Sequence, residues 1–373
     1  MYSKSQDYLI LIMLSVFGWL FLLCISHSTY GQVPTANKIK GMSFIGPHDP
    51  ILEPYMIDAI DSIHADWIAI IPEATLDRGT LNLLPDSQNN NWSETKNGVT
   101  EIIKLCQESD KKIMLKPQII LDKTTQPNAL LNELASYVNL AYEKITDKTY
   151  GAKWRGDFAA ATEADWKIFE ASYTDYILSY AELANAKNVD LFCIGTELRE
   201  SAISRPEYWK KLIRKVRSIY KGPIIYSANW DEYEEITFWK DLDYIGTNAY
   251  YPISPSETPT VEEAFENWRE IRKDLYAVSK RNNRKIIITE YGYRNVSYTG
   301  QMPWLHVGQV DSPIINDEAQ VNLYKAFYRA IWNEYWIAGG FGWNWTYVSQ
   351  RKGNTDFSVQ GKPAMKVIAS YYR

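Results

Sequence analysis

Eight short apolar segments recur along the chain, and their alternation with longer amphipathic segments limits the possible folds more than any other feature. Each segment has the length and composition of a strand that is buried on both faces of a sheet. The segments occupy residues 38–44, 66–71, 112–117, 190–195, 223–228, 243–248, 285–290 and 339–345. Strands that alternate with helices form a parallel sheet, and eight such units are typical of a closed barrel. We therefore predict an α/β fold, a single (β/α)8 TIM barrel.

Helical periodicity fills the intervals between these strands. It is evident at residues 54–65, 98–109, 206–220 and 318–335. The longest interval holds two more helical segments, at about 128–146 and 163–187, with the sequence DKTYGAKWRGDF between them. A loop of this size on a barrel is more often part of a site than filler, so Trp154 and Arg155 are candidate substrate contacts. Nothing in the composition divides residues 32–373, which we expect to form one catalytic domain.

Residues 1–31 have the pattern of a targeting segment. Lys4 precedes an apolar stretch, residues 8–25, and a short run of small and polar residues ends at Gly31. This order is typical of a secretory signal peptide, so we predict export to the medium, the periplasm or the cell surface, with cleavage after Gly31. Two alternatives remain open. Cys24 can be the acceptor of a lipid, and the apolar stretch is long enough to stay in the membrane as an anchor.

Charge and aromatic content indicate the class of partner. The net charge of −5 gives no basic surface of the kind that binds nucleic acid. The chain has 14 Trp and 27 Tyr, and side chains with a flat apolar face and a polar tip suit sugar rings. We therefore expect a monomer whose partner is a polysaccharide or oligosaccharide, with no nucleic acid partner. Any membrane attachment is expected through the N-terminus alone.

The motifs of several other chemistries are missing from the sequence. There is no HExxH, and His48, His64 and His306 are scattered, so we expect no metal. No GxSxG elbow and no phosphate-binding loop occurs, and no cofactor is implied. Cys106 and Cys193 lie in apolar helical and strand patterns, where we expect buried free thiols.

Two glutamates stand at the ends of predicted strands. Glu197 follows the segment 190–195, and Glu290 ends the segment 285–290 within the sequence KIIITEYGY. Catalytic groups of such barrels lie at the carboxyl ends of the strands. The fourth and seventh strands face each other across the barrel mouth, so both carboxylates can point into one cleft. Glycoside hydrolysis needs such a pair, one to protonate the leaving oxygen and one to attack the anomeric carbon or activate water.

The chain resembles the clan A glycoside hydrolases. The strings IGTEL (194–198), TEYGY (289–293), GWNW (342–345) and WRG (154–156) are most similar to glycoside hydrolase family 113, whose characterised members degrade β-mannan. The resemblance covers nearly all of the chain after the targeting segment. It implies that Glu197 is the acid/base and Glu290 the nucleophile of a retaining enzyme that acts on β-1,4-mannosidic linkages. We then expect their carboxyl groups to lie about 5–5.5 Å apart, with Glu197 desolvated and Glu290 ionised and hydrogen-bonded.

The remaining candidate residues lie near the strand ends. Alternation along the strand sends Trp343 and Trp345 to the same side, and the resemblance implies that Trp343 faces the sugar beside Glu290. Tyr250 and Tyr251 are candidates to donate a hydrogen bond to Glu290. The other predicted substrate contacts are Asn229 and Asn248, as holders of sugar hydroxyls, together with Trp230, Lys116, Gln118, Trp154 and Arg155.

Three functions remain open from the sequence. The first is a β-mannanase or β-mannosidase, the second is a β-glycosidase that acts on β-glucan or xylan, and the third is a non-catalytic carbohydrate-binding barrel at the cell surface. Only the first two require both glutamates. Endo or exo action depends on whether loops such as 147–162 or 295–316 close one end of the cleft.

Overall fold

The computed structural model describes residues 38–85, 91–122, 154–309, 312–348 and 353–373. The predicted targeting segment 1–31 and the helix expected at about 128–146 lie outside the described residues. All described residues belong to one compact unit, Thr35–Arg373. None of the described helices is long and apolar enough to cross a membrane.

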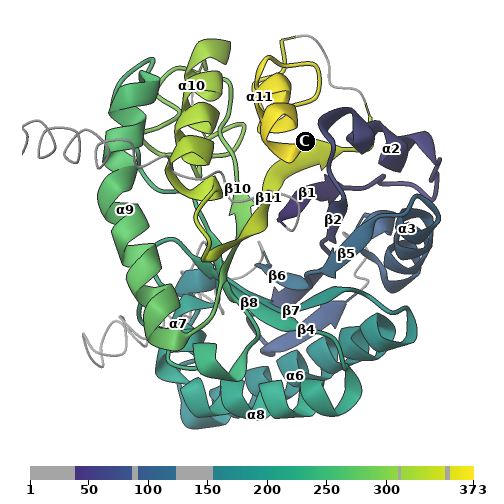
Figure 1. Cartoon of the computed structure of the whole chain (residues 1–373). Helices are drawn as coiled ribbons and strands as arrows, with labels where there is room; N and C mark the ends of the chain where they lie inside the picture. The colour runs from purple at the N-terminus through teal and green to yellow at the C-terminus, as the bar shows by residue number, and fades with distance from the viewer. Residues whose placement is uncertain (1–37, 86–90, 123–153, 310–311, 349–352) are drawn as a thin grey trace, which may run out of the picture. The chain divides into compact units, whose positions relative to one another are not determined.

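Eight parallel strands close into a barrel in the order β1-β11-β10-β9-β8-β7-β5-β2 (Figure 1). They are β1 (Ile39–Ile45), β2 (Trp67–Ile70), β5 (Lys112–Leu115), β7 (Leu191–Thr196), β8 (Ile224–Asn229), β9 (Ile245–Asn248), β10 (Ile286–Tyr291) and β11 (Ile337–Thr346). Each strand coincides with one of the eight predicted segments to within two residues at either end. The predicted (β/α)8 barrel is therefore confirmed. The pairing of β1 with β11 closes it, so the purple and yellow strands lie side by side in Figure 1.

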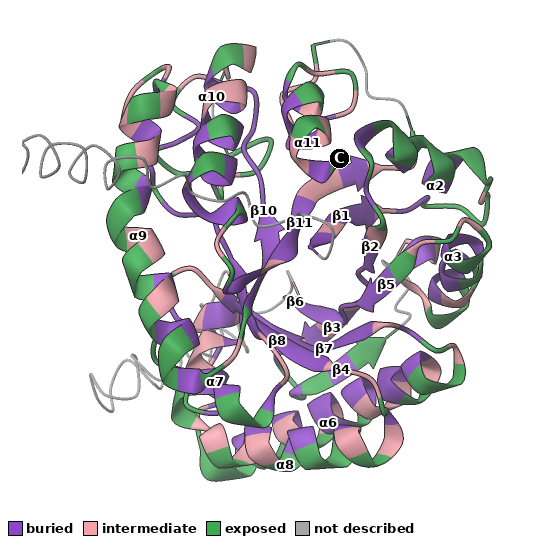
Figure 2. Cartoon of the chain, viewed as in Figure 1, coloured by how far each residue is buried: buried purple, intermediate pink, exposed green. Residues whose placement is uncertain are grey.

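Helices surround the barrel (Figure 1). They are α2 (Tyr55–Asp58), α3 (Lys96–Glu108), α6 (Glu163–Ala186), α7 (Arg199–Ser204), α8 (Pro206–Ile219), α9 (Val261–Asn282), α10 (Asp317–Phe327) and α11 (Ala364–Tyr372). Short turns of other helical types lie at η2 (Ala59–Ile63), η3 (Trp92–Glu94), η5 (Arg155–Asp157), η6 (Trp239–Asp241) and η7 (Tyr328–Trp332). The two longest helices begin at threonine caps. The Thr162 hydroxyl accepts a hydrogen bond from the Asp165 N–H group, and the Thr260 hydroxyl accepts one from the Glu263 N–H group. Figure 2 shows that the barrel strands are mostly buried, whereas the helices carry both buried and exposed residues.

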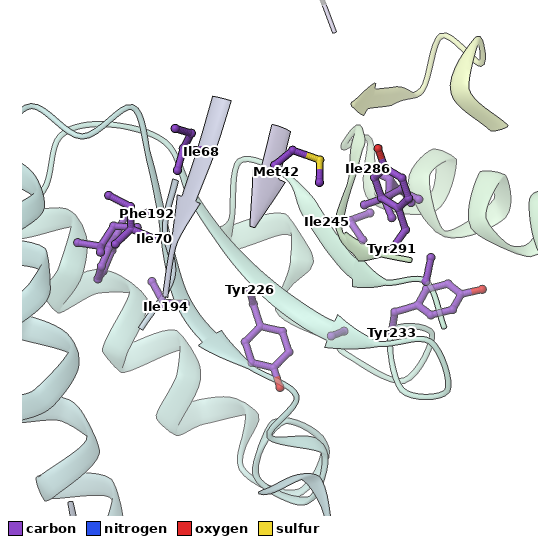
Figure 3. Close-up of a cluster of buried hydrophobic side chains, with 14 of the residues drawn as sticks. Met42, Ile68, Ile70, Phe192, Ile194, Tyr226, Tyr233, Ile245, Ile286 and Tyr291 are labelled. Carbon is purple, nitrogen blue, oxygen red and sulfur yellow. The ribbon is translucent and has the colours of Figure 1, made fainter. Parts of the chain in front are cut away.

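Residues on the two faces of the barrel strands, except β9, contribute to two apolar clusters. In β7, Phe192 and Ile194 belong to the larger cluster, which also contains helix residues such as Trp209 and so lies between strands and helices. Figure 3 draws part of it. The smaller cluster holds the residues on the opposite face of the strands: Ile39, Ala69, Met114, Leu191, Cys193, Ile225, Ile287 and Phe341. These fill the barrel interior below the site. Both Cys106 and Cys193 are buried free thiols, as predicted.

A three-stranded sheet outside the barrel was not predicted from the sequence. Its strands are β3 (Glu73–Asp77), β4 (Asn82–Pro85) and β6 (Gln118–Leu121), in the order β4-β3-β6. Strands β3 and β6 continue the chain just beyond β2 and β5, after Pro72 and Pro117, which cannot donate to a strand ladder. Their parallel register places Glu73 opposite Gln118. The sheet therefore brings two polar side chains together at the barrel rim.

A close approach between β8 and β9 gives a test of the fold. A Cβ atom on Gly246 would lie 2.2 Å from the Tyr226 carbonyl oxygen, a backbone atom that cannot move aside. We expect Gly246→Ala to lower the free energy of unfolding by about 3 kcal/mol. The control is Gly79→Ala, where the nearest atom is the Asp77 carboxylate oxygen at 3.2 Å. Equal denaturant midpoints for the two variants would contradict this packing.

Candidate active site

The two predicted catalytic glutamates line one cavity of about 710 Å³ at the carboxyl ends of the strands. Glu197 follows β7, and Glu290 is the fifth residue of β10. Several other predicted contacts line the same cavity, namely Gln118, Trp154, Arg155, Asn229, Trp230, Tyr250 and Trp343. A cavity of this volume has the size of small-molecule sites in proteins. The structure thus brings together residues that are separated by more than a hundred positions in the sequence.

The carboxyl group of Glu197 is held by three described side chains. The side chain of Asn248 donates to its Oε1 atom at 2.7 Å. Arg155 and Trp154 donate to its Oε2 atom at 3.1 and 3.3 Å. Glu197 is only 6% exposed, so these donors replace most of its water. The amide of Asn248 is itself oriented, because its oxygen accepts hydrogen bonds from Ser227 and Thr289.

Arg155 remains a cation in this environment. Burial alone would lower the pKa of its guanidinium group, but the carboxylates of Glu197, Glu73 and Glu290 more than offset burial and raise it. The guanidinium group of Arg155 forms an ion pair with the Glu197 carboxylate at 3.1 Å. The expected burial of Glu197 is present. Neighbouring buried carboxylates repel each other unless cations compensate them, and Arg155 supplies such a cation.

The backbone at Glu197 is unusual. Its φ angle is 52°, in the left-handed region, which costs a residue other than glycine roughly 1–2 kcal/mol. Its own N–H group donates to the Ser227 carbonyl at 2.8 Å, and the next N–H group, of Leu198, donates to the Tyr226 hydroxyl at 2.8 Å. Such conformations persist when surrounding contacts hold them in place, and they are concentrated at functional sites.

Glu290 is held by a different set of donors. It is 5% exposed and forms an ion pair through Oε1 with Lys116, whose side chain has no exposed surface. Its Oε2 atom accepts a hydrogen bond from the Tyr250 hydroxyl at 3.0 Å. Burial, followed by the charges of Glu290 and Glu197, raises the pKa of Tyr250 well above its usual value, so this phenol keeps its proton and donates it. The predicted hydrogen-bonded surroundings of Glu290 are present.

Trp343 and Trp345 do not share a side of β11. Trp343 lines the cavity, whereas Trp345 is 2% exposed and packs in the cluster between strands and helices. The prediction that Trp345 lies over the sugar site is wrong because the strand does not alternate regularly here. Met42 of β1 pairs with Gly342 of β11, and Phe44 pairs with Trp345. Between these two pairs β11 has one more residue than β1. An extra residue of this kind reverses the side to which the following side chains point.

Three other predicted contacts lie behind the cavity wall. Lys116 and Asn248 are fully buried and bind Glu290 and Glu197, so they position the carboxylates rather than touch a sugar in the cavity. Tyr251 packs its ring against Trp268, and Tyr250 alone of the two tyrosines reaches Glu290. Consecutive residues that leave a strand point to opposite sides, which separates these two tyrosines.

Sequence reasoning missed part of the cavity wall. The additional lining residues are Glu73, Ile120, Asp157, Arg199, Asp231, Trp304, His306, Gln309 and Phe357. Glu73 comes three residues after β2, so the strand-end argument that identified Glu197 would also have found it.

Burial lowers the pKa of His306, which favours its neutral form. No group of three or more His, Cys, Asp or Glu within the described ranges is arranged to hold a metal ion.

The rim beside Glu197 is charged and aromatic. Arg199 forms ion pairs with Asp157 and Asp231, and its guanidinium group lies 5.6 Å from the centre of the Trp154 ring. Farther out, Trp230 and Trp304 stack with their ring centres 5.7 Å apart. The cavity therefore offers flat apolar faces and paired charges, which suits a ligand with many hydroxyl groups.

A family model described as Glycoside Hydrolase Family 113 matches residues 144–362. The chain belongs to this family. The match includes Glu197, Glu290 and Trp343, and family membership makes the protein a glycoside hydrolase. No curated protein matches the chain.

Solved structures of family 113 have the same fold. One is the β-mannanase AaManA from Alicyclobacillus acidocaldarius in complex with ManMIm, with a TM-score of 0.73 and 21% identity over 90% of this chain and 97% of that chain. Another, a complex of a family 113 β-1,4-mannanase, has a TM-score of 0.70 and 21% identity over 90% of this chain and 99% of that one. A β-glucuronidase from Ruminococcus gnavus has a TM-score of 0.54 and 15% identity, covering 90% of this chain and 49% of that one. At these identities the likeness shows the fold.

The two tryptophans of β11 give a matched pair of variants. Trp343→Ala removes an aromatic face from the cavity wall, so we expect kcat/KM to fall at least roughly tenfold with little change in melting temperature. Trp345→Ala empties part of the core and should lower the free energy of unfolding by about 3–5 kcal/mol. Activity and melting curves of both variants provide the test. A strongly destabilised Trp343→Ala whose folded fraction is fully active would show that Trp343 is a core residue.

Proposed function

We propose that this family 113 glycoside hydrolase is a retaining enzyme that cleaves β-1,4-mannosidic linkages in mannan or manno-oligosaccharides. The observation that carries the proposal is a pair of buried glutamates that line one cavity, each bound by one cation and by uncharged donors. The choice of sugar is supported by the similar structures, which are named as β-mannanases.

In the first step, a carboxylate oxygen of Glu290 bonds to the anomeric carbon as the glycosidic bond breaks, and Glu197 gives its proton to the leaving oxygen. The contacts with Lys116 and Tyr250 support the nucleophile role of Glu290. They stabilise a charged carboxylate and restrict its rotation before attack. Tyr250 lines the cavity itself, so its hydroxyl also lies near the bound sugar.

In the second step, Glu197 takes a proton from water, the water oxygen bonds to the anomeric carbon, and Glu290 leaves as a carboxylate. Glu197 must therefore act as a base here after acting as an acid. Arg155 donates to one carboxyl oxygen of Glu197 and restricts its rotation. Asn248 is uncharged and donates to the other carboxyl oxygen, so it can hold the group in both forms.

The glycan is tested with a panel of β-linked polysaccharides and oligosaccharides, with products followed over time. We expect β-mannan and manno-oligosaccharides to be cleaved and the first product to keep the β configuration. Cleavage of β-glucan or xylan alone would show that the substrate is another β-linked glycan and would leave the proposed mechanism unchanged. Binding without cleavage of any glycan would favour the non-catalytic barrel. The sizes of the early products separate endo from exo action.

Leaving-group dependence separates the roles of the two glutamates. We expect Glu290→Ala to abolish turnover on every substrate, because the covalent intermediate cannot form. Glu197→Ala should lose far less kcat/KM on an activated aryl β-mannoside than on a manno-oligosaccharide, because a good leaving group needs no proton. Equal losses on both substrates in Glu197→Ala would overturn the acid/base assignment.

We also propose that the chain is exported, because residues 1–31 have the pattern of a signal peptide. N-terminal sequencing of the protein isolated from its host provides the test. A mature N-terminus just after Gly31 is expected for a cleaved signal peptide. A lipid-modified Cys24 or an intact Met1 would instead indicate an anchored protein.

A further inference from the structure

A buried carboxyl group lies behind the wall of the active site. Glu232 is 1% exposed and does not line the cavity, and no step of the proposed mechanism uses it. Its Oε1 atom accepts a hydrogen bond from the Tyr226 hydroxyl at 3.2 Å. Its Oε2 atom has no hydrogen-bond partner among the described residues. A buried carboxyl with so few partners is costly, so its presence in the core needs a physical explanation.

Tyr226 links this carboxyl to the chain beside Glu197. Its hydroxyl oxygen accepts the N–H group of Leu198 at 2.8 Å while its own proton goes to Glu232. The ring has no exposed surface and packs edge-to-face against Trp209, with the ring centres 5.0 Å apart. The Tyr226 hydroxyl therefore has little freedom to move.

The peptide that Tyr226 holds is the one that joins Glu197 to Leu198. Glu197 has a φ angle of 52°, which a residue with a side chain rarely adopts. On the other side of this residue, its N–H group donates to the Ser227 carbonyl at 2.8 Å. Adjacent residues of β8 thus hold the backbone before and after Glu197. Loss of one contact would let the peptide rotate and change the direction of the carboxyl group.

We propose that Tyr226 and Glu232 are positioning residues for Glu197. Glu232 fixes the Tyr226 hydroxyl, and that hydroxyl fixes the peptide after Glu197, which keeps the Glu197 carboxyl aimed at the leaving-group oxygen. This inference rests on the proposed role of Glu197 as the acid/base.

Because the Tyr226 hydroxyl donates to Glu232, position 232 must offer a hydrogen-bond acceptor, but this acceptor need not be charged. Burial, followed by the Glu197 charge, raises the pKa of Glu232 well above its usual value, which favours the neutral acid. Burial likewise raises the pKa of Tyr226, so the phenol keeps its proton. A glutamine at position 232 retains a carbonyl oxygen of the same reach and can accept from Tyr226. A leucine fills similar space and cannot.

The test compares kcat/KM on two substrates, a manno-oligosaccharide and an activated aryl β-mannobioside. For Tyr226→Phe and Glu232→Leu we expect a loss of roughly tenfold or more on the oligosaccharide, and of less than about threefold on the aryl substrate, because misdirection of the acid affects only the substrate that needs a proton. Glu232→Gln should restore most of the oligosaccharide activity. All assays are run well below the melting temperature of each variant.

The matched control is Tyr220→Phe, which removes another buried tyrosine hydroxyl, bonded to the Val189 carbonyl at 2.7 Å. It should lower the melting temperature and leave the ratio of the two activities unchanged. Equal losses of Tyr226→Phe on both substrates, or a Glu232→Gln variant as impaired as Glu232→Leu, would overturn the inference. If Glu197→Ala itself showed no leaving-group dependence, the proposed function would fail instead.

Discussion

A lysine with no exposed surface and the carboxylate it binds form the interaction on which the site depends. Lys116 follows β5 and Glu290 lies in β10, so their ion pair crosses the interior of the closed barrel. Removal of either partner would leave a buried charge without compensation, which is costly in a low-dielectric interior. The closed barrel holds both strand ends in place, and the pair in turn presents a charged, oriented carboxylate to the cavity. Tyr250, two residues after the end of β9, completes this arrangement.

Glu197 is held in place differently from Glu290. Its backbone is strained, its carboxyl is bound by Asn248 and Arg155, and its neighbouring peptide bonds to Tyr226. In the proposed acid/base role Glu197 both gives and takes a proton, which needs donors that tolerate two charge states, and Asn248 is one. Arg155 begins the short helical turn η5 before α6, whereas Lys116 directly follows the barrel strand β5. The two glutamates therefore receive their cations from different kinds of element.

The fold was predictable because each barrel strand is a separate apolar segment, and strand-end carboxylates stand out against such segments. The strands at Glu73 and Gln118 were missed because they are short and follow prolines directly after barrel strands. Trp345 was misplaced because the extra residue in β11 depends on pairing with β1, which local alternation does not reveal. The side chains of Lys116 and Asn248 belong to the site, but they point at the two carboxylates and not into the cavity. The position of a residue at a strand end does not tell which of these two directions its side chain takes.

The most direct test of the account is to trap the covalent intermediate. A 2-deoxy-2-fluoro-β-mannosyl fluoride slows both chemical steps, while its good leaving group lets the first proceed, so a glycosyl-enzyme accumulates. The account predicts that mass spectrometry of the digested protein finds one fluoromannosyl group on the peptide that contains Glu290. A label on Glu197, or an unlabelled protein that still hydrolyses β-mannan, would contradict the assignment of Glu290 as nucleophile.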